Sequence, residues 1–138
     1  MDQKLELIKQ VPLFSVCDKK GLEEIGRLAD EIDVPAGKVL MRQGEHADEF
    51  FVVISGTVRI ERDGVIVRSL GPGSFLGEAA LLDHGPRTAT ATTAVPSRLL
   101  VLGHRQFDQL VSEFPSIRAS VLAAVARRLR AAEPDASH

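Results

Sequence analysis

The feature that most constrains the fold is a series of short β-prone runs between residues 32 and 102, separated by glycine and proline turns. Phe50–Ile54 is a continuous run of strand-forming residues, which is typical of a strand buried on both faces. Asp63-Gly64 separates two β-rich runs and favours a two-residue hairpin, because both turn positions need positive φ. Such spacing predicts a β-barrel or jelly roll.

Helical periodicity flanks this β region on both sides. Apolar residues recur at helical spacing in residues 2–10 and 22–29, and again in 107–114 and 117–130. Pro115 is expected to break the last two apart, and the final helix is expected to end near residue 130. The predicted fold class is therefore mainly β with flanking α: a β-jelly-roll barrel (double-stranded β-helix) with N-terminal helices and C-terminal lid helices.

Length and composition place limits on the class of protein. With 138 residues the chain fits one domain, which we expect over residues 1–133, and residues 134–138 are expected to form a disordered tail. A net charge of -2 argues against direct nucleic-acid binding. A single cysteine, no apolar signal segment and no long apolar run predict a soluble, cytoplasmic protein without membrane association.

The segment from residue 75 to residue 89 contains the chemically informative residues. A glycine turn at Gly77 leads into helix-forming residues, and a helix start offers unpaired N–H groups that suit an anion. Arg87 supplies a planar set of donors suited to phosphate, and Thr88 adds a hydroxyl. Glu78 could accept hydrogen bonds from a sugar hydroxyl. This combination suits a sugar phosphate with one negative charge.

The same segment resembles the phosphate-binding cassette of the cyclic nucleotide-binding domain family. Leu76-Gly77-Glu78-Ala79-Ala80-Leu81 and Arg87-Thr88-Ala89 match the family pattern at every position, and the resemblance covers roughly residues 5–130. Gly44–Glu49, followed by Phe50–Val53 and Gly56, resembles the paired strands that precede the cassette. Met41 departs from the β-branched residue or cysteine that is usual there. Only 8 residues follow Arg130, so the chain resembles a Crp/Fnr-like effector domain without its DNA-binding part.

The resemblance implies a set of ligand-binding residues. Glu78 would accept from the ribose 2′-hydroxyl, Arg87 would pair with the cyclic phosphate, and backbone amides near Ala79, Ala80 and Thr88 would bind phosphate oxygens. The pocket would be lined by Val52, Val53, Phe75, Leu76 and the Ala89–Ala91 strand. Arg128 lies on a lid helix that would close over the purine and transmit the signal by its movement.

The resemblance implies a non-catalytic sensor of cAMP or cGMP without a cofactor, and the residues leave the choice between the two nucleotides open. Its output would require a protein partner or a covalently linked effector domain, and the C-terminal helix is expected to offer a homodimer surface. The main alternative is a ligand-free jelly-roll scaffold that has kept the fold. An enzyme is disfavoured because the four histidines are scattered and show no metal-ligand spacing.

Overall fold

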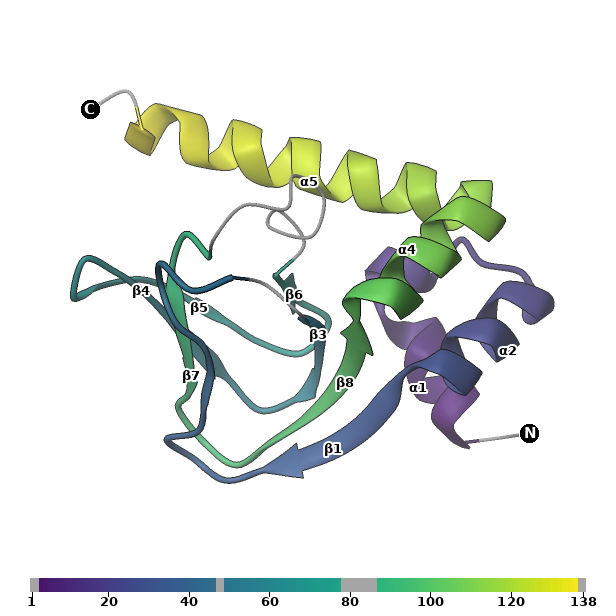
Figure 1. Ribbon diagram of the computed structural model, residues 1–138, viewed down its shortest axis with the longest axis horizontal. Helices are drawn as coiled ribbons and strands as arrows, with labels where there is room; N and C mark the ends of the chain where they lie inside the picture. The colour runs from purple at the N-terminus through teal and green to yellow at the C-terminus, as the bar shows by residue number, and fades with distance from the viewer. Residues whose placement is uncertain (1–2, 47–48, 78–86, 137–138) are drawn as a thin grey trace.

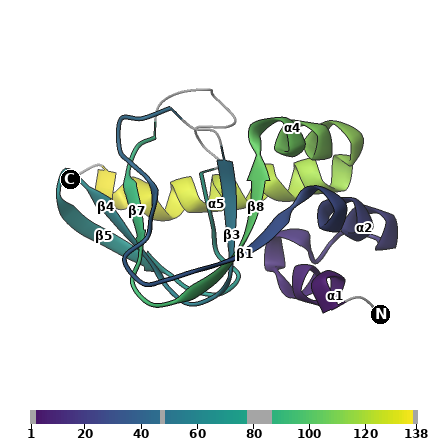
Figure 2. The ribbon, with the colours of Figure 1, turned by 60° about the horizontal axis from the view of Figure 1, so that its bottom comes forward.

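The computed structural model describes residues 3–46, 49–77 and 87–136, and at residue 125 and from residue 128 onward it describes the backbone alone. Three helices and a 3₁₀ turn gather at one end, the strands form a barrel at the other, and the last helix crosses over both (Figures 1 and 2). In chain order the elements are α1 (Gln3–Gln10), η1 (Pro12–Phe14), α2 (Lys19–Leu28), β1 (Asp30–Val34), β2 (Val39–Met41), β3 (Glu49–Ser55), β4 (Val58–Arg62), β5 (Val65–Leu70), β6 (Phe75–Leu76), β7 (Thr90–Thr93), β8 (Ser97–Gly103), α4 (His104–Glu113) and α5 (Pro115–Ala136).

The strands form two four-stranded antiparallel sheets. Their orders are β1-β8-β3-β6 and β2-β7-β4-β5. The hairpin between β4 and β5 turns at Asp63 and Gly64, whose φ angles are 54° and 80°. This is the positive-φ turn that the Asp-Gly dipeptide predicts. The expected mainly β architecture, with helices before and after the strands in the chain, is therefore confirmed.

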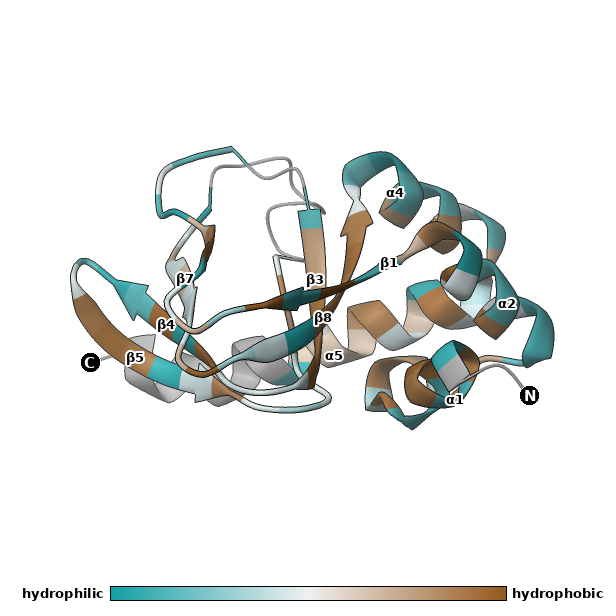
Figure 3. Cartoon of the chain, turned by 90° about the horizontal axis from the view of Figure 1, so that it is seen from below, coloured by the Kyte–Doolittle hydropathy of each residue, from teal (hydrophilic) through white to brown (hydrophobic). Residues whose placement is uncertain are grey.

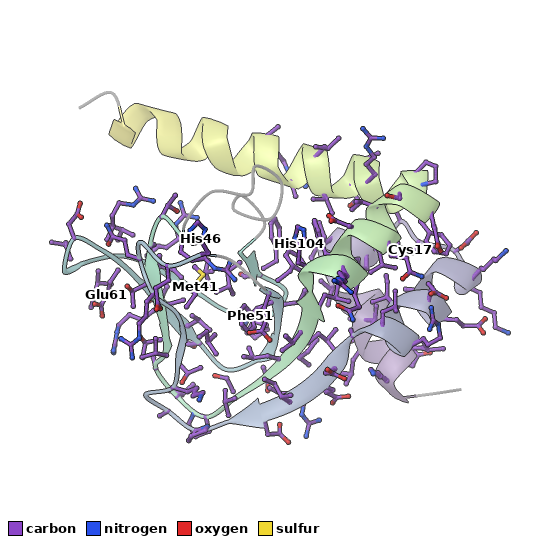
Figure 4. All side chains as sticks on the ribbon, viewed as in Figure 1. Cys17, Met41, His46, Phe51, Glu61 and His104 are labelled. Carbon is purple, nitrogen blue, oxygen red and sulfur yellow. The ribbon has the colours of Figure 1, made fainter. Side chains whose placement is uncertain are left out.

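Strand β3 contributes to two separate apolar cores. Phe50 and Val52 pack with the helices, whereas Phe51 and Val53 pack between the two sheets. Successive side chains of a strand point to opposite faces, so an uninterrupted apolar run supplies both cores. Figure 3 shows apolar colouring along most of β3 and of the neighbouring β8, and Figure 4 places Phe51 in the barrel and Cys17 among the helices.

Gly56 follows β3 at a point where no side chain would fit. Its φ is +97°, and a Cβ built there would lie 2.6 Å from the Cβ and 2.8 Å from the Cα of Ser97, at the start of β8. A real Cβ does not approach backbone this closely, so the contact between the two segments requires glycine.

Helix α5 is anchored to the helical end of the molecule by its first half. Ile117, Val121 and Ala124 are buried in the core that the helices share, and the Ser120 hydroxyl donates to the Leu13 carbonyl at 2.6 Å. The predicted break between the last two helices is confirmed at Phe114, which has extended φ and ψ of -124° and 91° because a proline follows.

The predicted end of the last helix near residue 130 is wrong, because α5 continues to Ala136. The two residues after Arg130 are alanines, the strongest helix formers, and they favour continuation of the helix beyond Arg130.

Candidate functional site

Arg87 is the buried polar centre of the candidate site. Only 5% of its surface is exposed, and its Nη2 atom donates to the main-chain carbonyl oxygen of Glu49 at 2.5 Å. Glu49 begins β3, so the guanidinium lies at the end of the central strand of one sheet. A buried arginine needs partners for its donors, and a planar guanidinium suits the paired oxygens of a phosphate.

The main chain of Arg87 is held as firmly as its side chain. Its N–H donates to the Glu45 carbonyl at 2.7 Å, and its own carbonyl accepts from the Gly44 N–H at 2.9 Å. These two bonds join the residues before β7 to the loop between β2 and β3, more than 40 residues earlier in the chain. The position of Arg87 therefore depends directly on that loop.

Gly77 provides the space in which the Arg87 guanidinium lies. Its φ is +93°, and a Cβ at this position would overlap the Arg87 Nη1 atom and lie 2.7 Å from the Glu49 carbonyl oxygen. Both the backbone conformation and the close approach require glycine. The group that approaches Gly77 closely in this structure is the Arg87 side chain.

The predicted lining residues are divided between the two apolar cores. Leu76, Val53, Ala89 and Ala91 are buried between the sheets, beside the site, whereas Val52 and Phe75 are buried in the core shared with the helices. The Thr88 side chain is exposed next to Arg87.

Other predicted site residues lie outside the described part of the chain. They are Glu78, Ala79 and Ala80, together with the side chain of Arg128. Their assigned roles stay predictions.

Sequence reasoning did not identify the main-chain groups that fix Arg87. The Glu49 carbonyl and the Gly44–Glu45 main chain act through atoms that every residue type carries, so side-chain identity gives little sign of them. The available signal was Gly44, whose φ of +87° is the reason for a glycine at this point of the upstream pattern.

Cys17 lacks the properties of a nucleophile. Burial, together with the negative charge of Asp18, raises the pKa of its thiol from 9.0 to about 11, so the reactive thiolate is scarce at neutral pH. Across residues 3–46, 49–77 and 87–136, no group of three histidine, cysteine or acidic side chains is arranged to hold a metal ion. Within the same ranges, no helix combines the length and apolar character needed to span a membrane.

Comparison with known proteins identifies the family. The model of the cyclic nucleotide-binding domain matches residues 31–114, which include the Gly44–Glu45 loop, Gly77 and Arg87. The chain belongs to the cyclic nucleotide-binding domain family. The jelly-roll prediction is thereby confirmed together with the two-sheet architecture.

The proteins that are similar to this chain include an ion channel and transcriptional regulators. A cyclic nucleotide-gated potassium channel of Mesorhizobium japonicum is 39% identical over 112 residues, which cover 81% of this chain and 31% of the channel. A CRP-like cAMP-activated global transcriptional regulator of Mycobacterium tuberculosis is 28% identical over 130 residues, covering 91% of this chain and 58% of the regulator. The crystal structure of the Thermus thermophilus catabolite activator protein superposes with a TM-score of 0.82 at 30% identity, covering 91% of this chain and 62% of that one.

The chain thus spans between about one third and three fifths of the length of these relatives. In each case the match is to one domain within a longer protein. The shared part is the cyclic nucleotide-binding domain.

Proposed function

We propose that this chain is a non-catalytic sensor domain that binds a cyclic nucleotide, with cAMP as the first candidate and cGMP as the second. The observation that carries the proposal is the buried guanidinium of Arg87, held against the Glu49 carbonyl in the space that Gly77 leaves open. In this arrangement Arg87 pairs with the cyclic phosphate through two parallel hydrogen bonds. Glu78 accepts from the ribose 2′-hydroxyl, and the main-chain amides of Ala79, Ala80 and Thr88 bind phosphate oxygens.

The proposed signal is a change in the position of α5. The first half of this helix is packed against the helical core, where Ile117 and Val121 are buried, while Leu122 on the same half remains 49% exposed. Ligand binding would favour the state in which the distal half, including Arg128, closes over the base. The output would reach a second copy of the chain, a protein partner or a linked effector domain in the cytoplasm, with residues 1–133 acting as one domain.

The test is ligand binding to Arg87 variants. We expect thermal unfolding of the wild-type protein to shift upward by about 10 °C with cAMP or cGMP at 100 times the dissociation constant, and little with 5′-AMP. Arg87→Ala should weaken binding by about 2–5 kcal/mol, or roughly 30-fold to several thousand-fold, because it removes one partner of a desolvated charge pair. Arg87→Lys should lose part of this affinity, since lysine keeps the charge without the planar donors.

Arg98→Ala is the matched control, because Arg98 is a half-exposed arginine paired with Asp33 and Glu31 on β1, away from the site. It should leave the affinity unchanged. Since Arg87→Ala also deprives the Glu49 carbonyl of its donor, denaturant unfolding without ligand must show that the variant is folded. Failure of both cyclic nucleotides to shift the ligand-free wild-type protein would refute the proposal and favour the scaffold alternative. Recovery of hydrolysed nucleotide after incubation would refute the non-catalytic part.

A further inference from the structure

The tip of the β4–β5 hairpin is joined to the loop that holds Arg87 by a reciprocal pair of hydrogen bonds. The Gln43 Nε2 atom donates to the Asp63 carboxylate at 2.9 Å, and the Asp63 main-chain N–H donates to the Gln43 Oε1 atom at 2.9 Å. We call this pair of residues the Gln43–Asp63 clamp. In Figure 4 the labelled Met41 and His46 bracket the loop, and Glu61 marks β4 beside it.

The clamp lies one residue away from the groups that fix Arg87. Gly44 and Glu45, which follow Gln43 directly, exchange the two main-chain hydrogen bonds with Arg87. The Gln43 N–H also donates to the Thr90 hydroxyl at 3.0 Å, so one residue contacts both the hairpin and the strand that follows the site. A displacement of Gln43 therefore moves the main-chain partners of Arg87.

The hairpin makes a second contact with the same region. The Arg62 guanidinium donates to the Thr88 carbonyl at 3.3 Å, next to Arg87. Asp63 has a left-handed backbone with a φ of 54°, and Gly64, the next residue of the turn, also has a positive φ. The hairpin tip thus contacts the surroundings of Arg87 from two adjacent positions, Arg62 and Asp63.

We propose that Gln43 and Asp63 are positioning residues for the phosphate site: their reciprocal hydrogen bonds hold the Gly44–Glu45 main chain where it fixes Arg87. This inference rests on the proposed function, since the affected affinity is that for a cyclic nucleotide. Both side chains are exposed and available to solvent, so their contribution lies in orientation rather than in burial. The hairpin becomes part of the binding machinery through this contact.

An added charge and its compensation test the clamp. Gln43→Glu replaces the donating amide by a carboxylate opposite Asp63, and we expect it to weaken cAMP binding about threefold to tenfold, by loss of one hydrogen bond and repulsion of like charges. Asp63→Asn alone keeps an acceptor for Gln43 and the left-handed backbone, and should bind as wild type. In the double variant that combines Gln43→Glu with Asp63→Asn, the new amide at position 63 can donate to the new carboxylate at position 43. This variant should therefore recover the affinity for cAMP. Gln106→Glu, an exposed glutamine on α4, controls for the added charge.

Amide hydrogen exchange without ligand gives a readout that is independent of nucleotide binding. The Arg87 and Gly44 amides should exchange several-fold faster in Gln43→Glu and return to the wild-type rate in the double variant. Unchanged exchange and unchanged affinity in Gln43→Glu, or failure of the double variant to recover either, would overturn the inference. If the wild-type protein binds no cyclic nucleotide, the proposed function fails, and the exchange rates alone then decide whether the clamp holds the loop.

Discussion

Gly77 allows a sharp test of the site, because its replacement by alanine would disturb Arg87 without changing any charged group. The new Cβ would lie against two neighbours, the Arg87 guanidinium and the Glu49 main-chain carbonyl. The guanidinium is the end of a flexible side chain and can move aside, whereas the carbonyl belongs to β3 and cannot move without disturbing the sheet. Displacement of Arg87 from its place is therefore the expected response.

The effect of Gly77→Ala has two parts, the cost of left-handed backbone and the cost of the close contacts, and a control variant separates them. Forcing an alanine into left-handed backbone costs about 1–2 kcal/mol. Gly37 has a similar φ of +81° with no atom within 4 Å of its Cβ position, so Gly37→Ala measures the backbone cost alone. We expect Gly77→Ala to lower the free energy of unfolding by more than Gly37→Ala does, and to weaken cAMP binding tenfold or more, up to the loss seen in Arg87→Ala.

Urea unfolding without ligand and calorimetric titration with cAMP give the two quantities. Gly37→Ala should lose stability and keep its affinity. Combining Gly77→Ala with Arg87→Ala should cost little further affinity, because both changes remove the same interaction. Wild-type affinity in Gly77→Ala, with a stability loss no larger than that of Gly37→Ala, would refute the argument that this glycine makes room for the phosphate-binding arginine.

Two further predictions concern the helical end of the molecule. Asp18→Ala should lower the free energy of unfolding in denaturant by about 1 kcal/mol, since the Asp18 carboxylate accepts from the Gly21 N–H at 2.8 Å as the cap of α2, whereas Asp18→Asn should retain most of this contribution. The raised pKa of Cys17 stabilises the folded protein fully below about pH 9, and this contribution should be lost as the pH rises from about 9 through about 11. Thermal unfolding of the wild type and of Cys17→Ala across this range should therefore diverge, and parallel curves would show that the thiol is not buried.

The parts of this fold that the sequence predicts correctly are those determined by residues adjacent in the chain. The Asp63-Gly64 turn and the apolar run of β3 are recognisable because their conformations are dictated by a few adjacent residues. The break at Phe114 follows in the same way from the proline after it. The end of α5 is harder to predict, because Arg127, Arg128 and Arg130 suit the end of a helix, whereas the alanines that follow favour its continuation.

The support of Arg87 is beyond this kind of reasoning. Its partners come from residues 44, 45 and 49, about 40 positions away, and they contribute main-chain atoms whose direction depends on the folded sheet. The Gln43–Asp63 clamp is equally non-local, since each residue alone is an ordinary exposed polar residue. Spacing could indicate that Gly77 and Arg87 act together, but only the folded chain shows what holds them.

The contact at Gly56 has a consequence for how β3 tolerates insertion and deletion. Because β3 is apolar on both faces, a deletion of one residue near its centre would exchange side chains between the two cores and still present apolar groups to each. The apolar pattern of β3 therefore does not distinguish the native register from one that is shifted by a single residue. The deletion would, however, bring Thr57 to the place where Gly56 lies against Ser97, and a β-branched residue cannot occupy it. The alignment of β3 is thus set by steric fit at its C-terminal end, where Gly56 lies against Ser97. In a library of deletion variants, we expect a one-residue deletion in β3 to be tolerated only when a one-residue insertion before Gly56 returns the glycine to this place.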